Sequence, residues 1–385
     1  MARTLGLALI VTALLAACGG AAPAPAGSSF PAAKSSVAGS AAQKPSAGTA
    51  AVAKDGPSFT FKLATGFPQT DFSAQGLQHW ADMVGERTGG RIKFQFFWAA
   101  SLLNTTQLFQ GIRDGLADFG DPATSFTSGQ VPDVASFEVP FSYPLDNDHT
   151  LPFYREIEPV MDQIYSSAGR QHIVWMEDAT SSIPSVVTCK NKFLDSAQAW
   201  QGALVRTAGK WQGATAERWG AKPVVIDLSE AYSAIQRGTA DCLLFTYSLL
   251  DSFKMYEVAK NLTRIDHSVN LATVDVNADS WNKLPAADQQ ILKQAGTETE
   301  DWLLGQRTQV IDQSLNHLKQ MGMNMCVPTQ QELARLRAAT EPVLADIAKT
   351  QTDKGKRLQD ISKKYRDMVK TPGPVQGDMT PCPAK

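Results

Sequence analysis

The chain has 385 residues, of which 43% are hydrophobic and 19% are charged, and its formal net charge is only −2. Lys and Arg are scattered along it, so the sequence lacks the concentrated basic patch of nucleic-acid binding proteins. After Ala17, no apolar run reaches the roughly 20 residues that a membrane-spanning helix needs. Composition therefore argues against a nucleic-acid partner and against an integral membrane protein.

The first residues have the pattern of a secretory signal. Arg3 precedes an apolar run at positions 5–17, which is too short to span a bilayer and has the length of a signal-peptide core. The run ends in Leu-Ala-Ala-Cys at positions 15–18, which resembles a bacterial lipobox. We expect residues 1–17 to be removed and Cys18 to carry a lipid anchor; cleavage among the alanines without lipidation is the alternative.

Residues 18–57 are dominated by Ala, Pro, Gly and Ser. Such a segment has too little apolar bulk to form a core, so we expect a disordered tether close to a membrane surface outside the cytoplasm. About 330 residues remain, enough for two domains of ~100 to 200 residues each.

The remaining chain alternates predicted strands and helices, which favours an α/β fold. A strand at 59–65 is followed by a helix whose apolar residues, Leu77, Trp80, Ala81 and Val84, share one face. Further strands are expected at 92–96, 173–176, 185–189, 202–207, 224–226 and 271–276. From residue 284 onward the chain is expected to be mostly helical.

One segment recurs 123 residues further along the chain, from Asn104 to Asp227. Each copy predicts a helix with a polar N-cap, a Gln or Glu three residues later, a terminating glycine and an Ala-Asp pair before a strand. The pattern favours two similarly wound α/β lobes with a cleft between them. Asn104, Gln107, Phe109, Ile112, Gly115, Ala117 and Asp118 recur as Asp227, Glu230, Tyr232, Ile235, Gly238, Ala240 and Asp241.

Catalytic motifs are missing from the sequence. The five histidines are isolated, and there is no nucleophile elbow, zinc-binding helix, phosphate loop or dinucleotide turn. A carboxylate pair is one interpretation of Asp118 and Asp241, but their repeated position favours backbone capping instead. We therefore favour a binding protein over an enzyme and expect neither cofactor nor metal.

Four cysteines, Cys189, Cys242, Cys326 and Cys382, follow the lipobox cysteine. In an oxidising compartment they can form up to two disulfides. We expect a bridge from Cys189 to either Cys242 or Cys326.

Several motifs in one order resemble the extracytoplasmic solute receptors of tripartite ATP-independent periplasmic (TRAP) transporters. The resemblance covers residues 58–345 and is stronger in the second half. Its motifs are TGGRI at 88–92, GLAD at 115–118, VPF at 139–141, QGALVR at 201–206, SEAYSAIQRGTAD at 229–241, YEVAK at 256–260 and WNKLP at 281–285.

The resemblance implies a monomeric, lipid-anchored receptor that closes on a small organic acid and hands it to a permease driven by an ion gradient. Its fold would be the two-lobe periplasmic-binding, or Venus-flytrap, fold, with crossing strands and a long helix spanning both lobes. Lobe 1 would comprise residues 58–180 with 272–311 returning to it. Lobe 2 would comprise residues 181–271 with 312–370 packing on it, and residues 371–385 would form a C-terminal tail.

In that family a strand arginine pairs with the ligand carboxylate, and Arg206 occupies its position. A buried guanidinium is costly unless it is paired, and its planar fork suits a carboxylate. The alternative is an arginine paired with a carboxylate of the protein itself.

Two departures bear on the ligand. Phe245 stands where acidic-sugar receptors of this family have an Asn, and a second family arginine is missing from residues 180–185. Together with Phe67, Phe126 and Trp211, this predicts a monocarboxylate with an apolar or aromatic body. Thr124, Asn104 and Tyr247 complete the predicted ligand contacts. A receptor of an ATP-driven importer and a lipid-anchored hydrolase remain alternatives.

Overall fold

The structure, a computed structural model, describes residues 55–169, 171–177, 183–268, 270–374 and 376–383. The expected signal peptide, Cys18 and most of the expected tether lie outside these residues. None of the described helices is both long enough and apolar enough to cross a membrane.

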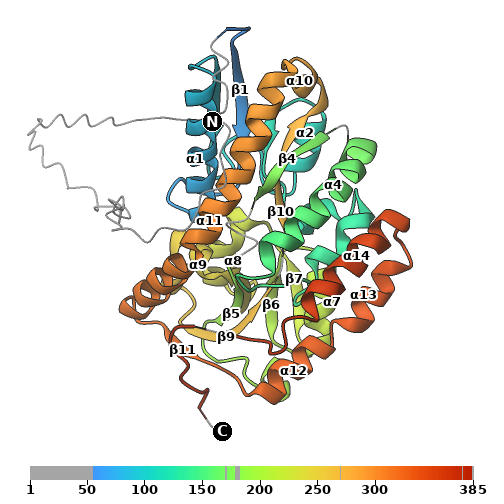
Figure 1. Cartoon of the computed structure of the whole chain (residues 1–385). Coiled ribbons are helices and arrows are strands. Elements are labelled where there is room, and N and C mark those ends of the chain that lie inside the picture. The colour runs from blue at the N-terminus through green and yellow to red at the C-terminus, as the bar shows by residue number, and fades with distance from the viewer. Residues whose placement is uncertain (1–54, 170, 178–182, 269, 375, 384–385) are drawn as a thin grey trace, which may run out of the picture. The chain divides into compact units, whose positions relative to one another are not determined.

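A five-stranded sheet is the first of two (Figure 1). Its strand order is β2 (Ile92–Phe97), β1 (Phe59–Ala64), β3 (Phe119–Gly120), β10 (Ala272–Asn277) and β4 (Gln171–Glu177). β1 is parallel to β2 and β3, whereas β10 is antiparallel to β3 and β4. The sheet therefore combines four strands from residues 59–177 with one, β10, that returns at residues 272–277.

The second sheet has six strands, in the order β11 (Asn324–Cys326), β9 (Asn261–His267), β5 (Ser185–Cys189), β8 (Cys242–Thr246), β6 (Leu204–Thr207) and β7 (Lys222–Val225). β6 lies between β8 and β7 and is parallel to both. β5 is antiparallel to β8 and β9. Arg206 thus lies on an inner strand of this sheet.

Helices α1 (Phe72–Arg87), α2 (Leu108–Arg113) and α4 (Thr150–Gly169) accompany the first sheet, and α7 (Lys210–Trp219), α8 (Ala231–Arg237) and α9 (Tyr247–Ser252) accompany the second. Asp71 caps α1 by accepting from the Ser73 N–H at 2.9 Å. Gly115 and Gly238, the paired glycines of the repeat, both have left-handed φ, 76° and 77°, and end α2 and α8. The repeat therefore marks equivalent helix ends in the two lobes.

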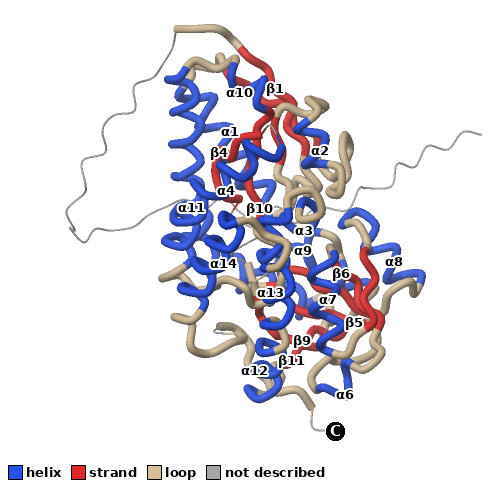
Figure 2. The backbone as a smooth tube through the Cα atoms, turned by 90° about the vertical axis from the view of Figure 1, so that its right-hand side faces the viewer, coloured by secondary structure: helices blue, strands red, loops and turns tan. Residues whose placement is uncertain are grey.

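Helix α11 (Ala286–Gln320) is 35 residues long and packs on α1, α4 and β4 of the first lobe and on α9 of the second (Figure 2). In its first half, Leu292 O accepts from Trp80 Nε1 of α1 at 3.0 Å. A side chain at Gly296 would collide with Trp175 of β4. In its second half, His317 Nδ1 lies 2.6 Å from Asp251 Oδ1 of α9. These contacts confirm the predicted two-lobe α/β fold with a long helix spanning both lobes.

The last helices are α12 (Gln330–Ala338), α13 (Glu341–Ala348) and α14 (Asp353–Arg366). Leu358 and Ile361 of α14 belong to one apolar cluster with Phe153 of α4. Glu156 of α4 also accepts from Tyr365 at 2.8 Å. The expectation that all of residues 312–370 pack on lobe 2 is therefore wrong for α14, because its apolar face is complementary to α4.

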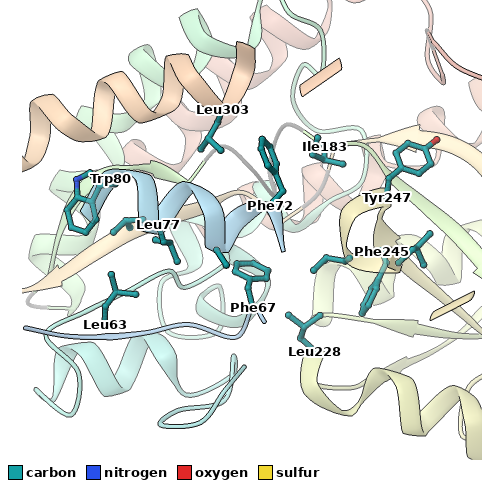
Figure 3. Close-up of a cluster of buried hydrophobic side chains, with 14 of the residues drawn as sticks. Leu63, Phe67, Phe72, Leu77, Trp80, Ile183, Leu228, Phe245, Tyr247 and Leu303 are labelled. Carbon is teal, nitrogen blue, oxygen red and sulfur yellow. The ribbon is translucent and has the colours of Figure 1, made fainter. Parts of the chain in front are cut away.

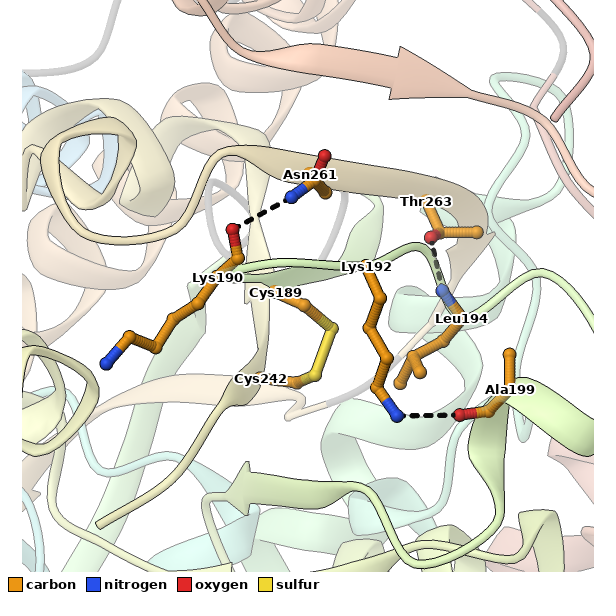
Figure 4. Close-up of a disulfide and its surroundings, with 8 residues drawn as sticks. All are labelled: Cys189, Lys190, Lys192, Leu194, Ala199, Cys242, Asn261 and Thr263. Atoms are coloured by element: carbon orange, nitrogen blue, oxygen red, sulfur yellow. Dashed lines mark hydrogen bonds between the residues drawn. A yellow bond between two sulfur atoms is a disulfide. The ribbon is translucent and has the colours of Figure 1, made fainter. Parts of the chain in front are cut away.

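Two disulfides fix the second sheet and the chain end. Cys189 pairs with Cys242 between adjacent strands β5 and β8, with their Cα atoms 4.0 Å apart (Figure 4). Cys326 at the end of β11 pairs with Cys382 of the tail. The alternative Cys189–Cys326 bridge is wrong because β9 lies between β5 and β11, and two strand spacings exceed the reach of a disulfide.

Candidate ligand-binding site

A cavity of about 40 Å³ lies between the two lobes and takes its walls from both. The first lobe contributes Phe67, Thr105, Leu108, Asp121 and Phe126, and the second contributes Ser185, Arg206, Leu228, Leu244, Phe245, Thr246 and Leu249. Asn270, in the segment that crosses from β9 to β10, also lines it. Figure 3 shows Phe67 on one side of this space, with Leu228 and Phe245 on the other. The walls are mostly apolar, with a few polar groups.

Arg206 is the one cation among the cavity-lining residues, and its side chain is only 2% exposed. Its Nε donates to Ile226 O at 2.9 Å, and its Cζ lies 5.0 Å from the centre of the Phe245 ring. Its Nη2 has no hydrogen-bond partner, and no carboxylate of the described residues lies within ion-pair distance. Burial lowers the pKa of Arg206 to about 10, opposed by the charge of Asp227.

The N-terminus of α7, just after the Arg206 strand, is occupied by a carboxylate of the protein. Glu138 accepts from Gln212 N at 3.0 Å, from Trp211 N and from Ser128 Oγ at 2.7 Å. Burial raises the pKa of Glu138 to about 7, and these hydrogen bonds oppose the rise. The helix end is therefore satisfied internally, whereas the Arg206 Nη2 has no acceptor among the described residues.

Four of the eight predicted ligand contacts meet at the cavity: Arg206, Phe245, Phe67 and Phe126. The other four are not among its lining residues. Thr124 is buried at the start of the short helix α3 (Thr124–Thr127), and Asn104 accepts from Gln107 N at 3.0 Å in a turn. The Trp211 ring lies under Lys210, and the Tyr247 hydroxyl bonds with Arg264 and Asp266.

Several cavity residues were not predicted from the sequence. Asp121 directly follows β3, and its Oδ2 accepts from Thr65 Oγ1 at 2.7 Å. Ligands of α/β sheets bind at the carboxyl ends of parallel strands. The position of Asp121 directly after a strand was therefore the sequence signal that could have identified it. Asn270 Oδ1 accepts from Ser125 Oγ, and no local sequence pattern marks it.

The lobes also touch at the rim of the cavity. Asp227 Oδ2 accepts from Thr105 Oγ1 at 2.6 Å and from Thr106 N at 3.2 Å. Nearby, Asp71 Oδ2 accepts from Ser252 Oγ at 2.8 Å. The two N-terminal turns of the repeated segment therefore meet across the cavity, with the lobes in contact around it.

Comparisons with known proteins agree with this geometry. The family model "Bacterial extracellular solute-binding protein, family 7" matches residues 63–351. The ectoine/5-hydroxyectoine-binding periplasmic protein UehA of Ruegeria pomeroyi is 25% identical, over 80% of this chain and 89% of that protein. The sialic acid-binding periplasmic protein SiaP of Vibrio cholerae is also 25% identical, over 69% of this chain and 81% of that protein.

Solved structures show the same fold. A TRAP periplasmic solute-binding protein from Desulfovibrio salexigens with bound orotic acid has a TM-score of 0.75 at 20% identity, covering 80% of this chain and 99% of that one. The extracytoplasmic solute receptor DctP7 of Bordetella pertussis, which binds pyroglutamic acid, has a TM-score of 0.73 at 18% identity, covering 80% and 100%. The chain therefore belongs to the bacterial extracellular solute-binding protein family 7, as a TRAP-type solute receptor and not an enzyme.

Proposed function

We propose that this receptor binds a small organic monocarboxylate in the interlobe cavity and delivers it to an ion-gradient-driven TRAP permease. The observation that carries the proposal is the state of Arg206, which is buried at the cavity with an unpartnered Nη2. A ligand carboxylate supplies the missing acceptor and the missing counter-charge.

The energetics favour this pairing. A buried charge without a partner is costly, so a guanidinium in this position destabilises the empty receptor. A carboxylate can accept two parallel hydrogen bonds from the planar guanidinium, which fixes orientation as well as charge. Because the Arg206 Nε is already bound to Ile226 O, the Nη atoms are the ones left for the ligand.

The apolar walls define the rest of the ligand. Phe67, Phe126 and Phe245 line the cavity around Arg206, and none of the other described residues that line it is a cation. These rings favour a compact apolar or flat cyclic body over a polyhydroxylated sugar acid. Orotic acid and pyroglutamic acid, carried by the similar structures named above, are small cyclic acids and support the same choice.

A thermal-shift screen tests the function. Cyclic and branched monocarboxylates are compared with sugar acids, dicarboxylates and the uncharged amide of each hit. A true ligand at a hundredfold excess over its Kd stabilises the fold by about 2.7 kcal/mol. The expected result is stabilisation by a compact monocarboxylate and none by its amide. Equal stabilisation by acid and amide would contradict the proposal.

The same proposal includes a lipid anchor at Cys18. The support is the lipobox-like Leu-Ala-Ala-Cys at positions 15–18 and membership of a periplasmic receptor family. Wild-type protein from a bacterial host should partition into detergent, whereas Cys18→Ser should not. Identical partitioning of the two forms would rule out the anchor.

A further inference from the structure

A second cavity, of about 70 Å³, shares no lining residue with the ligand cavity. It is lined by the end of β9 and the residue after it, at positions 266–268, and by Pro184 just before β5. Both are ends of segments that run between the two sheets. Three helices close the cavity, and each contributes one arginine: Arg307 from α11, Arg337 from α12 and Arg366 from α14.

These arginines are held in place by the surrounding chain. Arg307, 4% exposed, donates to Asn147 Oδ1 at 2.6 Å and to Leu145 O. Arg366 is 6% exposed, and its Nη2 lies 3.0 Å from Glu341 Oε1. The Glu341 side chain is itself about half exposed. The guanidinium positions are thus set before any ligand arrives.

Arg337 is held by backbone carbonyls and not by an ion pair. It donates to two backbone carbonyls, Val369 O and Arg366 O, each at 3.0 Å. Among the described residues it has no carboxylate within ion-pair distance. Burial lowers the pKa of Arg337, and the nearby charge of Arg366 lowers it further. The charges of Asp367 and Glu341, which both pair with Arg366, oppose this fall, but neither carboxylate lines the cavity.

Two acidic residues line the cavity itself, and both already have partners. Asp266 is bonded to Arg264 and Tyr247, and Asp146 to His149. His267 Nδ1 lies 3.1 Å from Ser268 O, so it carries the proton and leaves Nε2 as an acceptor. That Nε2 is buried with no hydrogen-bond partner in the described part of the chain.

We propose that this second cavity binds a small oxyanion, with Arg337 and Arg366 as its principal donors and Arg307 on the wall beside them. Guanidinium forks match the oxygens of phosphate-like and carboxylate anions. A cavity needs roughly 10 to 15 Å³ to hold one water molecule. At about 70 Å³, this cavity has room for a compact anion. The neutral His267 Nε2 can accept a hydrogen bond from the hydroxyl of a singly protonated oxyanion such as hydrogenphosphate.

Calorimetry with inorganic phosphate tests the site on the full chain, with sodium chloride at equal ionic strength as reference. Wild type is expected to show one phosphate site, weakened at least tenfold in Arg337→Gln. Arg335→Gln is the matched control, because Arg335 lies on the same helix, pairs with Glu332 and does not line the cavity. Its phosphate affinity should equal that of wild type.

Arg206→Ala separates this site from the ligand cavity and should leave phosphate binding unchanged. Loss of phosphate binding in Arg206→Ala would overturn the proposal, as would no binding to wild type. If Arg337→Gln does not fold, Arg337→Lys is tested instead, because it keeps the positive charge but loses the planar guanidinium. Weaker phosphate binding in Arg337→Lys would support the site. Wild-type affinity in whichever of the two variants folds overturns it.

Discussion

Two arginines are buried in the second sheet, and they differ in how their hydrogen bonds are used. Arg264 on β9 donates to the Tyr247 hydroxyl at 2.8 Å and to the tail carbonyls of Gln376 at 2.7 Å and Asp378 at 2.6 Å. It also lies 3.3 Å from Asp266 Oδ2. Within the described part of the chain, Arg206 on β6 has one hydrogen bond, to Ile226 O, and its Nη2 has no partner.

Both guanidiniums also stack on aromatic rings two residues apart, Arg206 on Phe245 and Arg264 on Tyr247. The pKa values of the two arginines shift in opposite directions. Burial lowers the pKa of Arg264, but Asp266 and Tyr247 outweigh it and raise the pKa overall, whereas burial dominates at Arg206. Both arginines are buried, so the ligand-binding role proposed for Arg206 depends on its unsatisfied donor and not on its depth of burial.

The largest expected effect is on ligand affinity in Arg206→Ala. Breaking a desolvated charge pair by removing one partner costs about 3 to 5 kcal/mol. Calorimetry with the best acid from the screen should show binding nearly lost, while the stability of the empty protein is unchanged or raised. Wild-type affinity in a folded variant would make Arg206 structural.

Arg264→Ala should give the opposite pattern. Removing this arginine leaves Asp266 buried without its counter-charge and frees the two tail carbonyls, so unfolding free energy should fall by about 3 to 5 kcal/mol. Denaturant titration measures this loss, and calorimetry on the folded variant should show near-normal ligand affinity. A stable Arg264→Ala protein without ligand binding would reverse the roles assigned to the two residues.

Tyr247→Phe sharpens the contrast with a smaller change. The variant loses the hydroxyl that donates to Asp266 and accepts from Arg264, which should cost about 1 to 3 kcal/mol of stability. Ligand affinity should not change, because Tyr247 does not line the cavity. Tyr256→Phe is the matched control, since the structure describes no hydrogen bond of the Tyr256 hydroxyl. Weaker ligand binding by Tyr247→Phe would show that Tyr247 contributes to the ligand site after all.

Phe245→Leu should have the smallest effect. It removes the ring beneath the Arg206 guanidinium, an interaction worth roughly 0.5 to 2 kcal/mol, and should weaken acid binding by a similar amount. Phe253, which contacts Phe245 but does not line the cavity, provides the control variant Phe253→Leu. Equal affinities in the two variants would remove Phe245 from the ligand-binding account.

Local sequence patterns predicted the elements better than the side-chain directions. Alternation placed the first strand at 59–65, and β1 spans Phe59–Ala64. Tyr247, two residues after Phe245, would share its face if the strand continued. Instead Thr246 caps α9 by accepting from Leu249 N, the chain turns into a helix, and Tyr247 reaches Arg264. The end of a strand, which sequence sets only approximately, therefore decided whether a side chain met the cavity.

Other features of the structure depend on contacts between segments that lie far apart in the sequence. Asn270 reaches the cavity because the segment from β9 to β10 crosses between the sheets, and the Cys189 partner depends on β8 pairing with β5. Neither relation leaves a periodic or spacing signal in the sequence. Arg206 was selected because a resemblance to known receptors marked its position, and the structure places it among the cavity-lining residues.

The most direct test is a double-mutant cycle in which the ligand supplies one of the two changes. Wild type and Arg206→Ala are each titrated by calorimetry with the best acid and with its uncharged amide. If Arg206 binds the carboxylate, the acid should lose several kcal/mol of affinity in Arg206→Ala while the amide, already weak, loses little, giving a large coupling energy. A coupling energy near zero, with acid and amide affected alike, would contradict the account.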